Sequence, residues 1–230
     1  MPLISHPAMV KVRGFTRRLG LNNFLGKLLG VAGYEVLLQN EMRRAINEGD
    51  CVWDVGANIG WYTLQFAKWV GKGGHVIAFE PDAENAKVLH RAVYGLENVC
   101  VEVIALSNVG GYAKFLRGRD QLGATSMIVR ETGAESQTVI IESGDTVLAR
   151  NRTYFPNLVK IDVEGHELEV LEGMATTLKQ ANLRHLFIEV HFATLEMQGR
   201  HWVPLAIENL LVSNGFKLKW IDPSHLHAAR

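Results

Sequence analysis

A glycine-rich turn follows a short apolar segment and reads Asp54-Val55-Gly56-Ala57-Asn58-Ile59-Gly60. Glycines let the backbone turn tightly and let a ligand approach without a Cβ in the way. A helix that begins behind such a turn offers unpaired N–H groups and a partial positive charge to an anionic group. Glu80 stands 20 residues after Gly60, where its carboxylate can accept hydrogen bonds from both hydroxyls of a ribose. Together these features indicate a site for an adenosine-containing ligand.

The turn favours S-adenosylmethionine (SAM) over a dinucleotide. The fingerprint G-x-G-x-x-G fails here, because its second and third glycine positions hold Asn58 and Trp61. Asp54 would put a negative charge near a diphosphate, whereas it suits a ligand with a sulfonium and an ammonium group. We expect the carboxylate of SAM at the start of the helix, near Asn58, Tyr62 and Thr63. A nicotinamide-dependent oxidoreductase is the alternative among enzymes.

A second polar group follows another apolar segment, where Asp162 precedes Glu164-Gly165-His166-Glu167. Methyl transfer from SAM to an alcohol removes the alcohol's proton, which takes a general base or a metal that lowers the hydroxyl's pKa. Asp162 is the leading candidate, and its roles as base, as ligand of the cofactor's amino group and as metal ligand stay open. Glu164 and His166 are candidate acceptor contacts. Acids in a first helical turn are favoured anyway, so Glu167 is predicted to be structural.

A third polar group lies further along the chain, where Glu189 and His191 stand two residues apart. That spacing puts both side chains on one face of a strand. His191 is a candidate general base. Asp162, Glu189 and His191 could also form a mixed oxygen and nitrogen metal site. Because their spacing is not diagnostic, a divalent metal is the less favoured alternative.

The segments between these groups alternate between strand and helix patterns. Strands are expected over 51–55, 75–79, 99–106, 138–142, 158–163, 186–190 and 216–221. Helices are expected over 34–48, 61–70 and 81–95, from 165 onward, and over 204–215. This order predicts an α/β fold with a Rossmann-like, doubly wound, mostly parallel sheet, whose ligands bind at the carboxyl ends of the strands. Those ends carry Asp54, Glu80, Ser107, Asp162 and His191.

The chain is expected to form a single domain over residues 34–230, preceded by a basic arm or helical extension over 1–33. Residues 107–136 are rich in Gly, Ser, Arg and Thr, and so long an irregular segment is usually functional. We therefore expect an insertion over about 107–145 that forms a lid on the acceptor side. The segment that follows the expected strand over 216–221 is short, which predicts that the last part of the sheet is abbreviated. His225 and His227 are expected to lie in a mobile tail.

Composition excludes several classes of protein. The chain has 230 residues, with 24 basic and 24 acidic side chains, a balance that argues against a nucleic-acid binder. No apolar run approaches the roughly 18 residues of a membrane span. Cys51 and Cys100 both stand beside apolar residues and are expected to be reduced core thiols, as in a cytoplasmic protein. The oligomeric state is left open.

Three blocks of the sequence resemble the FkbM-type SAM-dependent methyltransferases. The first is VWDVGANIGWYT over 52–63, and the second is VIAFEP over 76–81 with ALSN over 105–108. The third is LVKIDVEGHE over 158–167 with LEG over 171–173. The third block is the most specific, because most other methyltransferases lack its D-x-E-G-H-E run.

The resemblance implies a Rossmann-like methyltransferase that methylates a hydroxyl of a sugar, glycan, polyketide or other small secondary metabolite. A catalytically silent SAM-binding module is the alternative outside enzymes. The expected cofactor contacts are Asp54, Gly56, Ala57, Asn58, Gly60, Tyr62, Thr63, Glu80, Pro81, Ser107, Asn108 and Asp162. The expected acceptor contacts are Ser126, Glu164 and His166. The expected catalytic residues are Asp162, Glu189 and His191.

Overall fold

The computed structural model describes residues 34–116, 127–129, 136–150 and 154–230. The predicted basic arm over 1–33 and the predicted acceptor contact Ser126 lie outside these residues. None of the described helices has the length and apolar character needed to cross a bilayer. Both cysteines are unpaired, but only Cys51 is buried. The expectation of a core position is wrong for Cys100, which is exposed.

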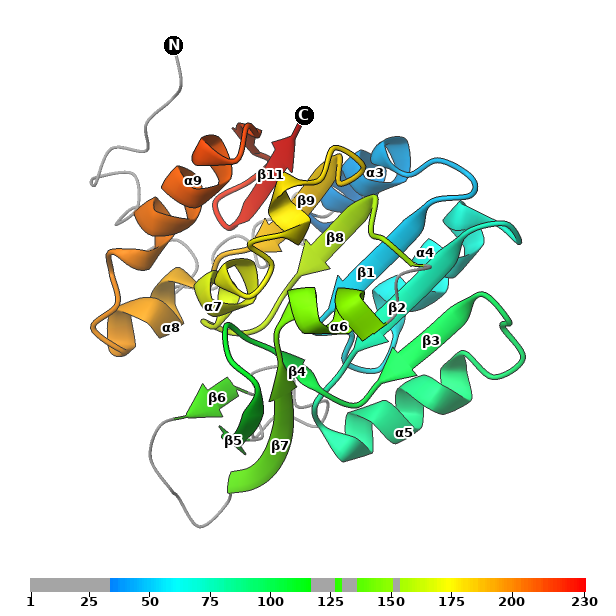
Figure 1. Cartoon of the computed structure of the whole chain (residues 1–230), viewed down its shortest axis with the longest axis horizontal. Coiled ribbons are helices and arrows are strands. Elements are labelled where there is room, and N and C mark those ends of the chain that lie inside the picture. Colours follow the sequence, from blue (N-terminus) through cyan, green and yellow to red (C-terminus); the bar gives the residue numbers. More distant parts are fainter. Residues whose placement is uncertain (1–33, 117–126, 130–135, 151–153) are drawn as a thin grey trace, which may run out of the picture.

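A seven-stranded sheet forms the centre of the molecule, in the order β10-β11-β9-β8-β1-β2-β3 (Figure 1). All neighbours pair in parallel except β11, which is antiparallel to both β9 and β10. The prediction of a doubly wound, mostly parallel sheet is confirmed. The strands are β1 (Cys51–Val55), β2 (His75–Phe79), β3 (Val99–Glu102), β8 (Leu158–Ile161), β9 (His185–Glu189), β10 (Lys217–Trp220) and β11 (His225–Ala229).

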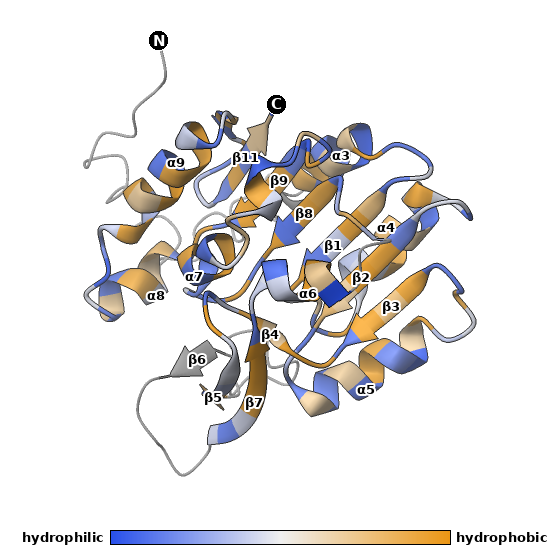
Figure 2. Cartoon of the chain, viewed as in Figure 1, coloured by the Kyte–Doolittle hydropathy of each residue, from blue (hydrophilic) through white to orange (hydrophobic). Residues whose placement is uncertain are grey.

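Helices cover both faces of this sheet. Val52 of β1 packs in the apolar cluster beneath α3 and α4, whereas its neighbour Trp53 packs in the cluster beneath α7 and α9. Because both faces are buried, the strands are mostly hydrophobic (Figure 2). The helices are α3 (Tyr34–Ala45), α4 (Trp61–Val70), α5 (Ala83–Ala92), α6 (Gly144–Arg150), α7 (Glu167–Glu172), α8 (Phe192–Met197), α9 (Val203–Ser213) and the short 3-10 helix η1 (Thr177–Lys179).

A second, four-stranded sheet lies beyond the carboxyl ends of the parallel strands (Figure 1). Its order is β4-β7-β5-β6, from β4 (Ala105–Leu106), β5 (Gly111–Leu116), β6 (Met127–Val129) and β7 (Ser136–Glu142). The described part of the predicted insertion belongs to this sheet. The prediction of one strand over 99–106 is wrong, because the chain bends at Ile104 and passes from the large sheet to the small one. Apart from Glu102 the segment is apolar, so its pattern does not reveal the bend.

The C-terminal segment completes the large sheet, so the predictions of an abbreviated sheet and a mobile tail are wrong. Strand β11 lies between β9 and β10, with Leu226 opposite Ile188. The side chain of Leu226 is fully buried, and the ring of His227 stacks on Phe187 at 4.1 Å between centroids. A turn at Asp222-Pro223-Ser224 reverses the chain before this strand, and Asp, Pro and Ser are typical turn formers.

Candidate active site

A cavity opens where the small sheet meets the carboxyl ends of β1, β2 and β8. Apolar walls come from Phe79, Ile104, Leu106 and Phe115. The position agrees with the rule that ligands bind at the carboxyl ends of the strands in such sheets. The cavity brings together seven of the residues predicted from the sequence: Gly56, Asn58, Glu80, Pro81, Asp162, Glu164 and His166.

The glycine turn packs directly on the loop that follows β8. Gly56 has a φ of +77°, and a Cβ at this position would lie 1.9 Å from the backbone oxygen of Asp162. Only glycine fits here. Asn58 also has a left-handed backbone, with a φ of 51°. Its Oδ1 is buried and has no hydrogen-bond partner among the described residues, which is typical of an atom that meets a ligand.

Glu80 lies at the end of β2, and its carboxylate is held in place by the backbone. Oε2 accepts a hydrogen bond from the N–H of Asn58 and Oε1 accepts one from the N–H of Asp82, both at 2.8 Å. Burial raises the pKa of Glu80 to about 7, against the opposing effect of these two hydrogen bonds. Each carboxylate oxygen keeps a further lone pair, so the group can still accept two hydroxyl hydrogens.

Lys160 is a buried cation beneath the glycine turn. Its Nζ lies 3.1 Å from Asp54 Oδ1, donates to the carbonyl oxygen of Gly56 at 2.9 Å, and lies 3.7 Å from Asp162 Oδ2. Asp54 is fully buried and also accepts a hydrogen bond from Thr63 Oγ1 at 2.7 Å. The polar groups of Asp54, Thr63 and Lys160 are therefore paired with one another inside the fold. Asp54 and Thr63 do not line the described cavity.

This ion pair also fixes the protonation state of the lysine. Burial lowers the pKa of an ammonium group, but the carboxylates of Asp54 and Asp162 outweigh it and hold the pKa of Lys160 above its ordinary value. The amine stays charged, and its positive charge neutralises the negative charge of Asp54 beneath the turn.

Other predicted cofactor residues lie around the cavity rather than on its described surface. Ser107 Oγ lies 2.9 Å from His166 Nε2, which joins the small sheet to the loop after β8. Asn108 is exposed, and its amide donates to Glu172 Oε2 at 2.7 Å. Three further predicted residues pack against the interior or shape the start of α4: Ala57, Gly60 and Tyr62.

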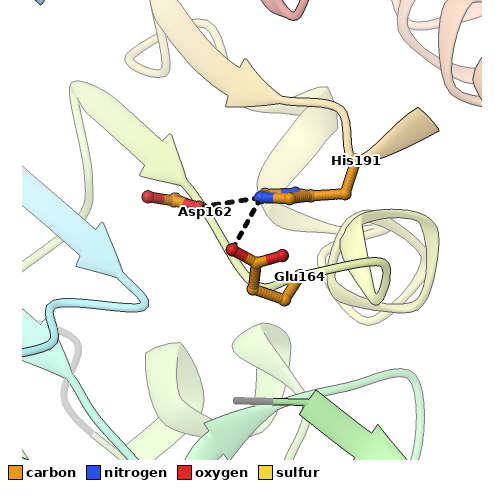
Figure 3. A group of neighbouring side chains, drawn as sticks. All are labelled: Asp162, Glu164 and His191. Atoms are coloured by element: carbon orange, nitrogen blue, oxygen red, sulfur yellow. Dashed lines mark ion pairs between the residues drawn. The ribbon is translucent and has the colours of Figure 1, made fainter. Parts of the chain in front are cut away.

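An imidazole surrounded by carboxylates forms the polar end of the site (Figure 3). His191 follows β9 and is 3% exposed. Its Nδ1 lies 2.6 Å from Oε1 of the fully buried Glu167. Its Nε2 lies 3.1 Å from Glu164 Oε1 and 3.5 Å from Asp162 Oδ1. The sequence analysis did not predict the contact of Glu167 with His191. An acid in a first helical turn gives the same sequence pattern whether or not it contacts a histidine.

Glu189 stands at the edge of this group. Its Oε1 is 3.9 Å from His191 Nε2, and its Oε2 is 3.4 Å from Nε2 of His225, another contact that the sequence did not indicate. The tightest group of potential ligand atoms consists instead of Asp162, Glu164 and His191, whose atoms all lie within 4.8 Å of one another. In this group of potential metal ligands, Glu164 therefore takes the position that the sequence analysis expected for Glu189.

The clustered charges shift the titration of both central groups. Burial lowers the pKa of an imidazole, but the adjacent carboxylates of Glu164 and Glu167 raise the pKa of His191 well above its ordinary value. Burial, and then the charge of Glu189, raise the pKa of Asp162. Perturbed groups of this kind are typical of functional sites.

The chain matches the family model described as the methyltransferase FkbM domain over residues 54–218. It is similar to the hexuronic acid methyltransferase AglP of Haloferax volcanii, with 29% identity over 194 residues that cover 82% of this chain and 76% of that protein. Its fold is similar to that of SMU.1697c from Streptococcus mutans, solved in complex with S-adenosylhomocysteine (SAH). That comparison has a TM-score of 0.53 at 9% identity and covers 86% of this chain and 97% of the other.

Proposed function

The chain belongs to the FkbM-domain methyltransferases, and from this premise we propose that it uses SAM to methylate a hydroxyl group of a sugar or glycan. Two observations support a sugar as acceptor. A relative at 29% identity is a hexuronic acid methyltransferase. The cavity also combines apolar walls with the carboxylates of Glu80, Asp162 and Glu164, which suit a polyhydroxylated molecule better than a polyanion such as a nucleic acid.

The residues at the turn fit SAM. Glu80 is fixed by two backbone N–H groups, and we assign it to the two ribose hydroxyls. The unpartnered Oδ1 of Asn58 is available for a donor of the same ligand. Ile104 and Phe79 supply apolar surface for the adenine. Lys160 neutralises Asp54 and holds the carbonyl of Gly56, so it keeps the turn in shape without contacting the ligand.

The bound cofactor supplies an activated methyl group, and the protein supplies alignment and proton removal. Alignment of the acceptor oxygen with the methyl carbon accounts for much of the catalysis. A hydroxyl acceptor must also lose its proton. We assign withdrawal of that proton to the cluster of Asp162, Glu164 and His191, because two of its members, Asp162 and Glu164, line the same cavity as Glu80. This juxtaposition is the observation that carries the proposal.

The test is transfer of isotope-labelled methyl from SAM to a panel of sugars, including hexuronic acids, followed by mass spectrometry of the product. We expect a methyl ether on a ring hydroxyl. Asp162→Asn is expected to lose turnover while it retains affinity for SAH. A product methylated only on nitrogen, or only on a carboxylate, would contradict the assignment to a hydroxyl. Binding of SAH without transfer to any acceptor would favour the silent module instead.

A further inference from the structure

We propose that Asp162, Glu164 and His191 bind a divalent cation at the acceptor end of the cavity. The inference deepens the proposed function and rests on it for the cation's role, but the site itself is argued from geometry. Two carboxylates and one imidazole meet there, with ligand atoms within 4.8 Å of one another. Asp162 and Glu164 both line the cavity. A cation held by three protein groups would therefore keep open positions toward the acceptor.

The imidazole is presented as a metal ligand would be. Glu167 Oε1 holds Nδ1 of His191 at 2.6 Å, so Nε2 is the coordinating atom once the cation displaces its proton. A carboxylate behind the far ring nitrogen is the usual support of a metal-bound histidine. Nε2 is buried, faces Glu164 and Asp162, and makes no well-aligned hydrogen bond with any residue in the described part of the chain. A cation between the three side chains would satisfy it.

The loop after β8 aims the carboxylate of Glu164 at this point. Glu164 has a left-handed backbone with a φ of 52°, and Gly165 follows with a φ of +97°. A left-handed residue that is not glycine stores strain and often marks a functional position. The turn is braced by Gly165, whose N–H donates to Glu167 Oε1 at 2.9 Å. One buried carboxylate thus holds both the turn that carries Glu164 and the ring of His191.

The donor set indicates the class of cation. Carboxylate oxygens suit Mg²⁺ and Mn²⁺, and imidazole favours the transition metals, so Mn²⁺ is the most suitable probe. Such a cation would bind the acceptor oxygen and lower the pKa of its hydroxyl. The hydroxyl proton would pass to the carboxylate of Asp162, which lines the cavity and belongs to the cluster assigned to proton removal. The oxygen lone pair then forms the C–O bond, and the electrons of the broken C–S bond stay on sulfur.

The test is Mn²⁺ binding to the full chain after treatment with a chelator, measured by electron paramagnetic resonance. We expect one Mn²⁺ per chain and nitrogen coupling from an imidazole in the pulsed spectrum. His191→Gln should remove the nitrogen coupling, and Glu164→Gln should weaken binding at least tenfold. Glu84→Gln is the matched control, because Glu84 is an exposed acid on α5 that pairs only with Lys87 among the described residues. It should bind Mn²⁺ like the wild type.

Melting temperature and SAH affinity establish that each variant is folded. Absence of Mn²⁺ binding in the wild type, or binding unchanged in both Glu164→Gln and His191→Gln, would overturn the cation site. Full sugar methylation by metal-free protein would overturn it while leaving the proposed function intact. Mn²⁺ binding that shows the expected losses, without methylation of any hydroxyl, would support the site and contradict the proposed acceptor instead.

Discussion

The ring of His191 is fixed by Glu167, whose Oε1 lies 2.6 Å from Nδ1 in a fully buried position. The same oxygen accepts the N–H of Gly165 at 2.9 Å. Glu167 does not line the described cavity, so it acts through the residues that do. It is a positioning residue for both the imidazole and the turn that carries Glu164.

We predict that Glu167→Ala lowers kcat more than it changes KM for SAM. Two buried donors lose their acceptor, which also destabilises the fold by about 1–3 kcal/mol each. Steady-state kinetics and thermal melting measure the two effects separately. Glu167→Gln keeps an acceptor oxygen of similar shape and should recover much of the stability and part of kcat. Equal losses in kcat and SAH affinity, or normal kcat in Glu167→Ala, would contradict the positioning role.

Glu80 carries the second prediction, which concerns cofactor affinity. Glu80→Ala should weaken SAH binding by about 100-fold or more, because it removes two charge-assisted hydrogen bonds to the ribose that are worth about 1.5–3 kcal/mol each. Calorimetric titration with SAH is the measurement. Glu84→Gln serves again as the surface control. Unchanged affinity in Glu80→Ala would remove Glu80 from the ribose site.

The raised pKa of Glu80, about 7, makes cofactor binding depend on pH. Ribose hydroxyls donate to the ionised carboxylate, so SAH affinity should rise as pH increases through 7 and then level off. Glu80→Gln cannot ionise and should show no such rise. Calorimetry at several pH values between about 5.5 and 8.5 tests this on both sides of the pKa of Glu80. A wild-type profile identical to that of Glu80→Gln would show that ionisation of Glu80 does not affect SAH affinity.

The same shift has the opposite consequence for the protein without ligand. A carboxyl whose pKa is higher in the folded state stabilises the fold most at pH values below its unfolded pKa, which is near 4.5. That contribution is lost as pH rises through about 7. Urea unfolding should therefore show the wild type losing stability relative to Glu80→Gln over this interval. A gain in relative stability would reverse the assigned direction of the shift.

The sequence was sufficient to predict the parallel strands of the large sheet and the position of the cavity. Strand β1 lies between β2 and β8, and the polar residues that follow these strands meet at one edge, as expected for the carboxyl ends of parallel strands. The turn at Gly56 was recognisable because a ligand-binding turn restricts residue type strongly. The FkbM family was recognised from local blocks for the same reason.

Contacts between segments far apart in the sequence could not be predicted from the sequence alone. Glu164 reaches His191 only because two successive left-handed residues turn the loop after β8, and no sequence spacing encodes that turn. Strand β11 was not predicted because His225 and His227 have no marked preference for strands. The segment is held as a strand by its pairing with β9. Of the small sheet, the sequence pattern indicated the strand over 138–142, which lies within β7, but it did not indicate that the chain passes into a separate sheet at Ile104.

Lys160 and Asp54 carry the last prediction, which concerns stability. The two residues are register partners on adjacent strands, and Lys160 Nζ lies 3.1 Å from Asp54 Oδ1. Lys160→Met should destabilise the fold by about 3–5 kcal/mol, because it leaves a buried carboxylate without its cation. The double variant Asp54→Asn/Lys160→Met removes both charges and should regain much of that loss. Urea unfolding of the wild type, both single variants and the double variant gives the coupling energy. Additive losses would mean that Lys160 stabilises the turn through the carbonyl of Gly56 rather than through Asp54.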